Sequence, residues 1–211
     1  MKDYLAELRT TIWRTAGARY NASRRLKRKE LFATVSLTFF SVITICLAVI
    51  QKIYSSEILQ SPSLDNYLTA LSILSGIFLL AISLMEWGAR NGSNADALHK
   101  NAEELNALQR RLQRELFKLD DVPGNWSVCG ELSDEYEAIQ SRYEVNHAPL
   151  DDQLFLAERR LAPEFKSRNI SECQGWVVKV VWFFSSIWYY LLFWVVSVIA
   201  LIPVILRLAL P

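Results

Sequence analysis

Two uncharged apolar runs dominate the hydropathy pattern of the chain. They cover residues 31–50 and 66–85, and each contains twenty residues without a charged side chain. A helix rises about 1.5 Å per residue, so each run is roughly 30 Å long, which is the thickness of a bilayer core. A secretory signal peptide fits the first run badly, because its apolar region would be too long and no small-x-small cleavage pattern follows it. Since only residues 51–65 connect the runs, we predict an antiparallel transmembrane hairpin with spans 31–50 and 66–87.

The charges that flank the hairpin predict its orientation. Residues 1–30 contain nine Lys or Arg against three acids, whereas the connecting loop contains one basic residue. Cytoplasmic segments of membrane proteins carry the excess of Lys and Arg. We therefore expect a multi-pass membrane protein with a cytoplasmic N-terminus. A basic cluster before the first span serves as the topology signal and binds anionic lipid; it consists of Arg24, Arg25, Lys27, Arg28 and Lys29.

A third apolar run lies near the C-terminus. Residues 180–206 carry no charge, and the segment from Trp176 onward is rich in aromatic side chains. Twenty-seven helical residues would be roughly 40 Å long, enough to cross a bilayer with tilt. We predict a third transmembrane helix within residues 176–211 that places the C-terminus outside. A membrane-embedded half-span or a helix covered by protein are the alternatives.

The parts between the spans show the periodicity of amphipathic helices. Residues 3–29 have an apolar stripe at intervals of three or four, and we expect this helix to continue into the first span, with a free interfacial helix as the alternative. A second stripe follows the hairpin at the same intervals. It predicts a coiled pair with the N-terminal helix and a seam for assembly between copies; its leucines are Leu98, Leu105, Leu108, Leu112, Leu116 and Leu119.

Shorter helices are predicted further along. Ser133 is a suitable N-cap for a helix over residues 133–147 that Pro149 would end, and residues 151–161 form one more short helix. The fold class is thus an all-α integral membrane protein. We divide it into a basic N-terminal cytosolic helix (1–30), the hairpin (31–87), a cytosolic helical region (88–175) and the C-terminal apolar helix (176–211).

Small and hydroxyl-bearing residues recur on one face of each hairpin span. They either line a water-filled path or allow close packing between helices, where hydroxyls bond across the interface. The residues of this candidate face are Thr34, Thr38, Ser41, Thr69, Ser72, Gly76 and Ser83. Glu86 is an acid at the inner edge of the second span, and such residues are often functional. Its alternative role is pairing with the basic cluster.

Motifs of catalysis or ligand binding are not evident. The three cysteines have no metal-ligand spacing, His99 and His147 stand alone, and the adjacent acids Asp151 and Asp152 are most simply the start of a helix. We therefore expect no enzyme activity, catalytic set, metal site or cofactor. Residues 88–175 carry sixteen acids against eleven bases, and the basic residues of the N-terminal arm adjoin a bilayer, so direct nucleic-acid binding is not expected.

Several stretches resemble the SLATT family of small two-span effectors. The basic-aromatic stretch 18–26 (ARYNASRRL) precedes the first span, and a long leucine-striped helix follows the hairpin. The stretch 143–147 (YEVNH) then precedes Asp151 and Asp152. The resemblance covers roughly residues 5–160, and the third apolar run departs from a two-span pattern.

The resemblance implies a membrane effector of prokaryotic anti-phage, or abortive infection, systems. Such an effector assembles as a homo-oligomer and compromises the membrane when triggered. Its partners would be a nucleotide-signal synthase, a nucleotide sensor or a reverse transcriptase system. The residues themselves are also compatible with a regulatory or scaffolding membrane subunit that anchors a soluble partner enzyme. Loss of membrane potential on expression would distinguish the effector from the scaffold.

Overall fold

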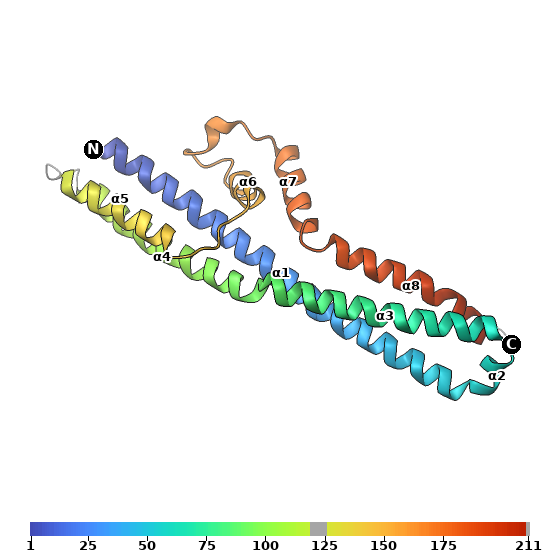
Figure 1. Cartoon of the computed structure of the whole chain (residues 1–211). Helices are drawn as coiled ribbons and strands as arrows, with labels where there is room; N and C mark the ends of the chain where they lie inside the picture. The colour runs from blue at the N-terminus through green and yellow to red at the C-terminus, as the bar shows by residue number, and fades with distance from the viewer. Residues whose placement is uncertain (119–125, 210–211) are drawn as a thin grey trace. The chain divides into compact units, whose positions relative to one another are not determined.

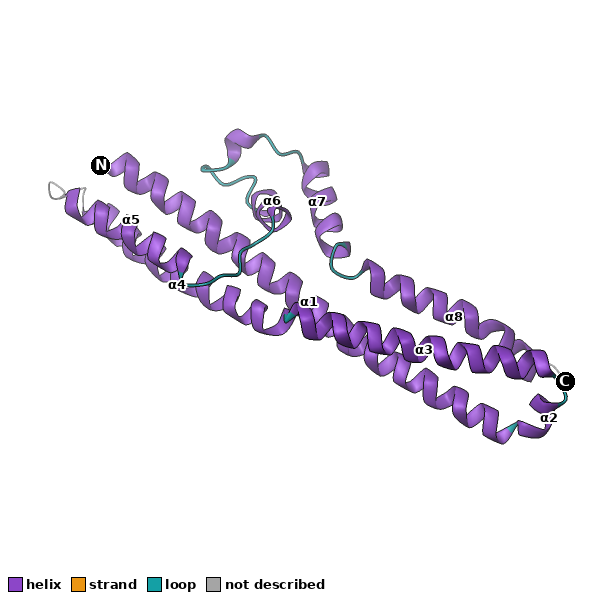
Figure 2. Cartoon of the chain, viewed as in Figure 1, coloured by secondary structure: helices purple, strands orange, loops and turns teal. Residues whose placement is uncertain are grey.

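The computed structural model describes residues 1–118 and 126–209, and over those residues it contains helices, turns and loops without strands (Figure 2). The helices in chain order are α1 (Lys2–Ile53), α2 (Ser55–Leu59), α3 (Pro62–Ala89), α4 (Asn91–Lys118), α5 (Trp126–Ser141), α6 (Pro149–Glu158), the 3₁₀-helix η1 (Lys166–Arg168), α7 (Glu172–Phe184) and α8 (Trp188–Ala209). α1, α3 and α8 each contain a stretch long and apolar enough to cross a membrane. The predicted class, an all-α membrane protein, is confirmed.

The chain divides into two units, each with its own core. Unit 1 comprises Met1–Lys27 and Gly92–Ser186, and unit 2 comprises Arg28–Asn91 and Ile187–Pro211. α1 is one continuous helix, so the N-terminal helix does run into the first span as expected.

Apolar side chains at helical spacing hold unit 2 together. They form stripes along α1, α3 and α8, and each of these side chains is nearly or fully buried. The buried members are Ala33, Phe40, Ile43 and Leu47 of α1, Ile58 of α2, Leu68, Leu71 and Ile82 of α3, and Tyr190 and Val204 of α8. Within unit 2, therefore, the three candidate spans meet along apolar seams.

Hydrogen bonds also join α8 to the hairpin. Trp194 donates its indole N–H to Ser36 Oγ at 3.0 Å, and Ser36 in turn donates to the carbonyl oxygen of Phe32 at 2.7 Å. Tyr67 donates its hydroxyl to the carbonyl oxygen of Ala200 at 2.7 Å, close to Pro203, which has no N–H of its own to donate. Polar groups inside a bilayer need such internal partners.

The leucine stripe of α4 packs against the first part of α1, which confirms the predicted pairing of these helices. Figure 1 shows the two helices running beside each other. α5 joins them as a third helix, and the sequence analysis did not predict this packing partner. The core contains Leu5, Leu8, Ile12 and Ala16 of α1, Leu105, Leu108, Leu112 and Leu116 of α4, and Cys129, Leu132 and Ile139 of α5. Leu119, the last residue of the predicted stripe, lies outside the described residues.

Two predicted helix boundaries are wrong. α5 covers Trp126–Ser141 instead of 133–147, and Ser133 lies inside it. Pro149 does not end a helix but begins α6, because its fixed φ suits the first turn and its missing N–H would be unpaired there in any case. Between α3 and α4 the left-handed residue is Arg90, at φ 48°, and neither neighbouring glycine has a positive φ.

The third apolar run is not one helix. α7 ends at Phe184 and α8 begins at Trp188. Ser185 and Ser186 donate their hydroxyls to the carbonyl oxygens of Trp182 and Phe183, at 2.8 and 2.9 Å. Such side-chain bonds compete with the amide donors that would continue a helix. The candidate span is therefore the 20 residues Trp188–Arg207, shorter than the run from which it was predicted.

Candidate functional site

The hydroxyl face of the first span points away from the seams of unit 2. Thr34 and Thr38 are exposed, and Ser41 is partly exposed. Each hydroxyl donates to the carbonyl oxygen four residues earlier, at 3.0, 3.1 and 2.7 Å respectively. The hydroxyl hydrogens are thereby occupied, and the oxygen lone pairs are what this face offers to its surroundings.

The corresponding face of the second span is also mostly exposed. Thr69, Gly76 and Ser83 are exposed, and a methyl group added at Gly76 would meet no atom within 4 Å. Thr69 accepts a hydrogen bond from Gln51 Nε2 of α1 at 3.2 Å. The Ser72 hydroxyl is shielded and has no hydrogen-bond partner among the described residues. Neither small-residue face is thus the main packing face inside the chain.

Glu86 lies at the end of the second span beside the α3–α4 junction. Asn91 donates its side-chain amide to Glu86 Oε2 at 2.9 Å, and the amide of Arg90 donates to the carbonyl oxygen of Glu86 at 3.1 Å. The described contacts of this acid therefore stabilise the junction, and a functional role for it remains a prediction.

The basic cluster has different surroundings along its length. In unit 1, Lys27 pairs with Asp96 at 3.2 Å, and Arg24 donates to Asn21 and lies 3.9 Å from Glu158. Arg25 forms a closer pair with Asp151, at 2.9 Å. Arg28 and Lys29 belong to unit 2. Arg24 and Lys27 have side chains more than half exposed, so they remain the cluster members of unit 1 best placed to meet lipid.

Asp151 is the centre of a buried polar network in unit 1. Its side chain is fully buried and accepts two hydrogen bonds from Arg25, from Nε and Nη2, both at 2.9 Å. It also accepts the indole N–H of Trp182 at 2.8 Å and the amide of Ala148 at 2.9 Å. Asn21 donates to its backbone carbonyl at 3.0 Å. One carboxylate thus ties α1, α6 and α7 together.

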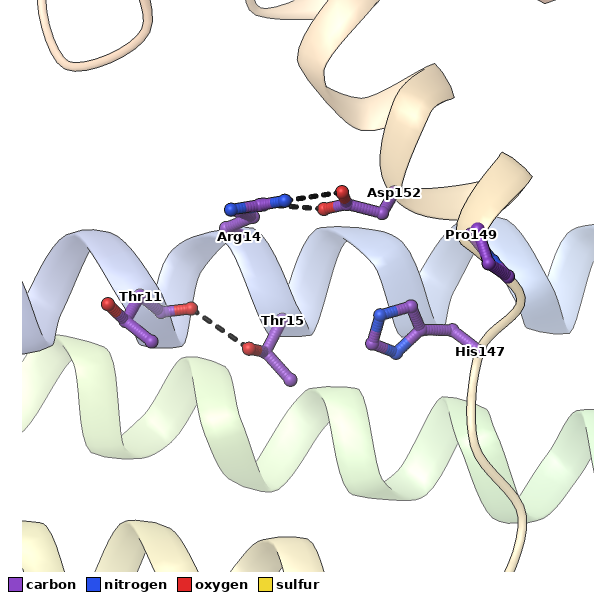
Figure 3. A pocket seen from close by; sticks show the side chains of 6 residues that line it. All are labelled: Thr11, Arg14, Thr15, His147, Pro149 and Asp152. Carbon is purple, nitrogen blue, oxygen red and sulfur yellow. Dashed lines mark hydrogen bonds and ion pairs between the residues drawn. The ribbon is translucent and has the colours of Figure 1, made fainter.

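Asp152 makes a parallel contact one residue later. Arg14 donates from Nε and Nη2 to its two carboxylate oxygens, both at 2.6 Å (Figure 3). This pair lines a pocket of about 290 Å³ together with Thr11, Thr15, His147 and Pro149. The adjacent acids do lie in the first turn of α6, where acids favour helix formation, but each also neutralises an arginine of α1.

Another arginine in the same part of α1 is buried. Arg19 is 3% exposed and donates to Asn101 Oδ1, while Asn101 donates to the carbonyl oxygen of Ile139 at 2.7 Å. Burial lowers the pKa of Arg19. The stretch 18–26 of the family resemblance therefore meets Asp151, the acid that follows the stretch 143–147, through Asn21 and Arg25. No sequence pattern assigned these partners.

Among the residues that the structure describes, no group of three or more His, Cys, Asp or Glu side chains could hold a metal ion. The described acids of the network are occupied by arginine and indole donors, which gives them a structural role.

His147 should make the stability of unit 1 depend on pH. Burial is the largest cause that lowers its pKa below the ordinary 6.5; Arg19 and Arg14 also lower it, while Asp152 and Asp151 oppose them. Above the pKa that His147 has in the unfolded protein, its imidazole is neutral in both the folded and the unfolded state. The full stability of unit 1 is therefore present there. As the pH falls below that value, the unfolded state binds the proton first and stability is lost until the folded pKa is passed.

The thermal unfolding temperature should therefore decrease as the pH is lowered from about 7.5 to about 5.5. This window brackets the unperturbed histidine pKa. His147→Gln should remove part of that fall. His99→Gln is the matched control, because His99 is exposed. Equal falls in the wild type and in His147→Gln would show that His147 is not the titrating group.

These features define a helical membrane protein with a polar-faced hairpin and a helical unit outside the spans. A sequence model of the SMODS and SLOG-associating 2TM effector domain family 5 matches residues 1–208, and the chain belongs to this family. No curated protein and no solved structure matched the chain. The chain is therefore a membrane effector of the kind found in conflict systems, and its family associates with SMODS and SLOG partners.

The family match is longer than the resemblance seen in the sequence. It extends past residue 160 through α7 and to residue 208 of α8. The third candidate span is thus part of the matched region, although the family description counts two spans.

Proposed function

We propose that this effector assembles in the bacterial inner membrane and permeabilises it when a cytosolic partner releases it. The observation that carries the proposal is the outward position of the hydroxyl faces in unit 2. The apolar stripes of α1, α3 and α8 are used inside the unit, whereas Thr34, Thr38 and Thr69 remain exposed. Exposed polar atoms in a bilayer are best satisfied by water or by another copy.

The proposal requires assembly between copies. Two helical faces of one chain cannot enclose a path, so several copies must bring their faces together around it. Positively charged segments stay cytoplasmic, which places the N-terminus and unit 1 inside the cell in this proposal. There unit 1 can meet a SMODS or SLOG partner, which the family description supports.

The orientation of the hydroxyls favours cations as the permeating ions. Thr34, Thr38 and Ser41 donate their hydrogens to backbone carbonyls, so their oxygens face outward as acceptors. Oxygen lone pairs replace the hydration shell of a cation but not that of an anion. Among the described exposed residues of this face, the hydroxyls are the polar groups available.

The test replaces two exposed hydroxyls by methyl groups of nearly the same shape. Thr38→Val with Thr69→Val should slow potassium efflux by about tenfold or more, since each ~1.4 kcal/mol added to a barrier gives a factor of ten. Efflux would be measured from phosphatidylethanolamine–phosphatidylglycerol vesicles containing the purified chain. In cells that express the chain without partner genes, a voltage-sensitive dye would follow the membrane potential.

The matched control is Val35→Thr, which makes the reverse exchange at an exposed apolar position of the same span. It should leave efflux unchanged. Cells that die with full polarisation would exclude permeabilisation and favour the scaffolding alternative. Undiminished efflux through the double valine variant would show that these faces are not the path.

A further inference from the structure

One face of α7 is fixed inside unit 1. Gly175 and Trp182 are its buried residues. Trp182 donates its indole N–H to Asp151, which also pairs with Arg25 of α1. Figure 1 shows α7 beside α6, the helix that carries Asp151. The position of α7 within the unit is therefore set by a buried polar contact as well as by packing.

The opposite face of α7 is apolar and exposed. Its side chains are between 43% and 65% exposed, which is unusual for residues of this size. They are Trp176, Val177, Val181, Phe183 and Phe184. At 100° per residue they lie on the side away from Gly175 and Trp182, and the exposed Lys179 borders them. A contiguous apolar surface of this kind marks an interaction site.

The chain connects this face to the membrane. Only Ser185, Ser186 and Ile187 separate α7 from the candidate span α8. Three residues reach at most about 10 Å, so the end of α7 must lie within about that distance of the membrane boundary. α8 itself begins with Trp188, an exposed indole of the type that is enriched at this boundary.

The length of α7 decides how it can meet the membrane. Its 13 residues form a helix of about 20 Å, which is too short to cross a hydrocarbon core of about 30 Å. We propose that α7 lies in the head-group layer of the bilayer, with its apolar face toward the acyl chains and Lys179 toward the phosphates. Helices with one apolar face and aromatic residues bind bilayers in this way.

A lipid surface fits this face better than a second copy of the chain. The face is continuous along the chain with a helix whose exposed side chains already require lipid, including Leu192, Val195 and Val196. Aromatic rings and a bordering lysine are the side chains that settle at head-group depth. Covering the face with lipid needs no further partner.

The experiment measures where α7 lies in vesicles of phosphatidylcholine and phosphatidylglycerol that contain the full chain. Cys173 is exposed in the first turn of α7, so replacing Cys46 and Cys129 by alanine leaves it as a native labelling site. Labels at Cys173, and in separate variants at Val177→Cys and Phe184→Cys with Cys173→Ser, would carry an environment-sensitive fluorophore. Ala107→Cys, exposed on α4, is the control position.

The labels on α7 should show blue-shifted emission, quenching by nitroxide-bearing lipids and loss of quenching by aqueous iodide, relative to the label at position 107. Iodide access equal to that of the control would overturn the proposal. Labels protected from iodide but not reached by the nitroxide lipids would also overturn it, because the face would then be covered by protein, such as a second copy. Cys173 decides the outcome even if the substitutions within α7 disturb folding.

Discussion

Asp151→Ala should lower the stability of unit 1 by ~3–5 kcal/mol, because removing one partner of a buried ion pair leaves the other charge uncompensated. The side chain of Arg25 is only 16% exposed, so water cannot fully replace the lost carboxylate. The variant also leaves the indole N–H of Trp182 and the amide of Ala148 without their acceptor. Urea unfolding of the detergent-solubilised chain, followed by tryptophan fluorescence, would measure the loss.

Asp152→Ala is the matched control. It removes the neighbouring carboxylate of the same helical turn, which also accepts two hydrogen bonds from one arginine, Arg14. The side chains of Arg14 and Asp152 are 37% and 18% exposed, so solvent screens this pair more strongly. We expect a loss of about 1 kcal/mol or less. Equal losses in the two variants would mean that burial does not set the strength of the Asp151 network.

Leu105→Arg combined with Leu112→Arg should unfold the α1–α4–α5 core. Both leucines are fully buried in that core. Each substitution removes a core side chain worth about 2–5 kcal/mol and places a charge where no partner is available, so the combined cost is comparable to the whole stability of a small domain. Circular dichroism of the full chain would detect the loss of helix, and limited proteolysis would detect new cleavage within residues 92–186.

The control pair is Ala107→Arg with Phe117→Arg, which adds two arginines at exposed positions of the same helix. That pair should leave helicity and protease resistance unchanged. The stripe is buried within its own chain, so its predicted use as a seam between copies would require unit 1 to open. Loss of oligomers with an intact core in the leucine variant would support that use instead.

The long helices could be predicted because their signals are local. Twenty uncharged residues imply a span whatever surrounds them, and leucines at intervals of three and four imply a helix with one buried face. The same signals could not show that the partners of Leu105 include α5. Its shorter apolar face, Cys129, Leu132 and Ile139, is too brief to identify what it packs against.

The Asp151 network could not be predicted, because its partners are far apart in the chain. Arg25 and Asp151 are separated by 126 positions. In the sequence Arg25 is one of several adjacent bases before a span, and Asp151 is one of two acids at a helix start. Each has a sufficient local explanation, so nothing in the pattern indicates that they pair.

The break between α7 and α8 was hidden for a different reason. Serine is common inside transmembrane helices, so Ser185 and Ser186 do not interrupt an uncharged run as proline or a charge would. Their effect depends on hydroxyl hydrogens turned back to the carbonyls of Trp182 and Phe183.

The sequence also could not predict whether the hydroxyl faces of the two hairpin spans point into the packed interior or outward. Small residues suit both kinds of face.

Gly17 of α1 allows α6 to approach closely, and this contact predicts which residues relatives carry at the two positions that meet there. A methyl group at Gly17 would overlap the ring of Phe155 of α6, which packs there with Trp13 and Phe165. Glycine weakens the interior of α1 by about 1 kcal/mol relative to alanine, so its presence favours docking over local helix stability. Relatives with alanine at this position should therefore carry a smaller residue opposite it, and the two positions should change together.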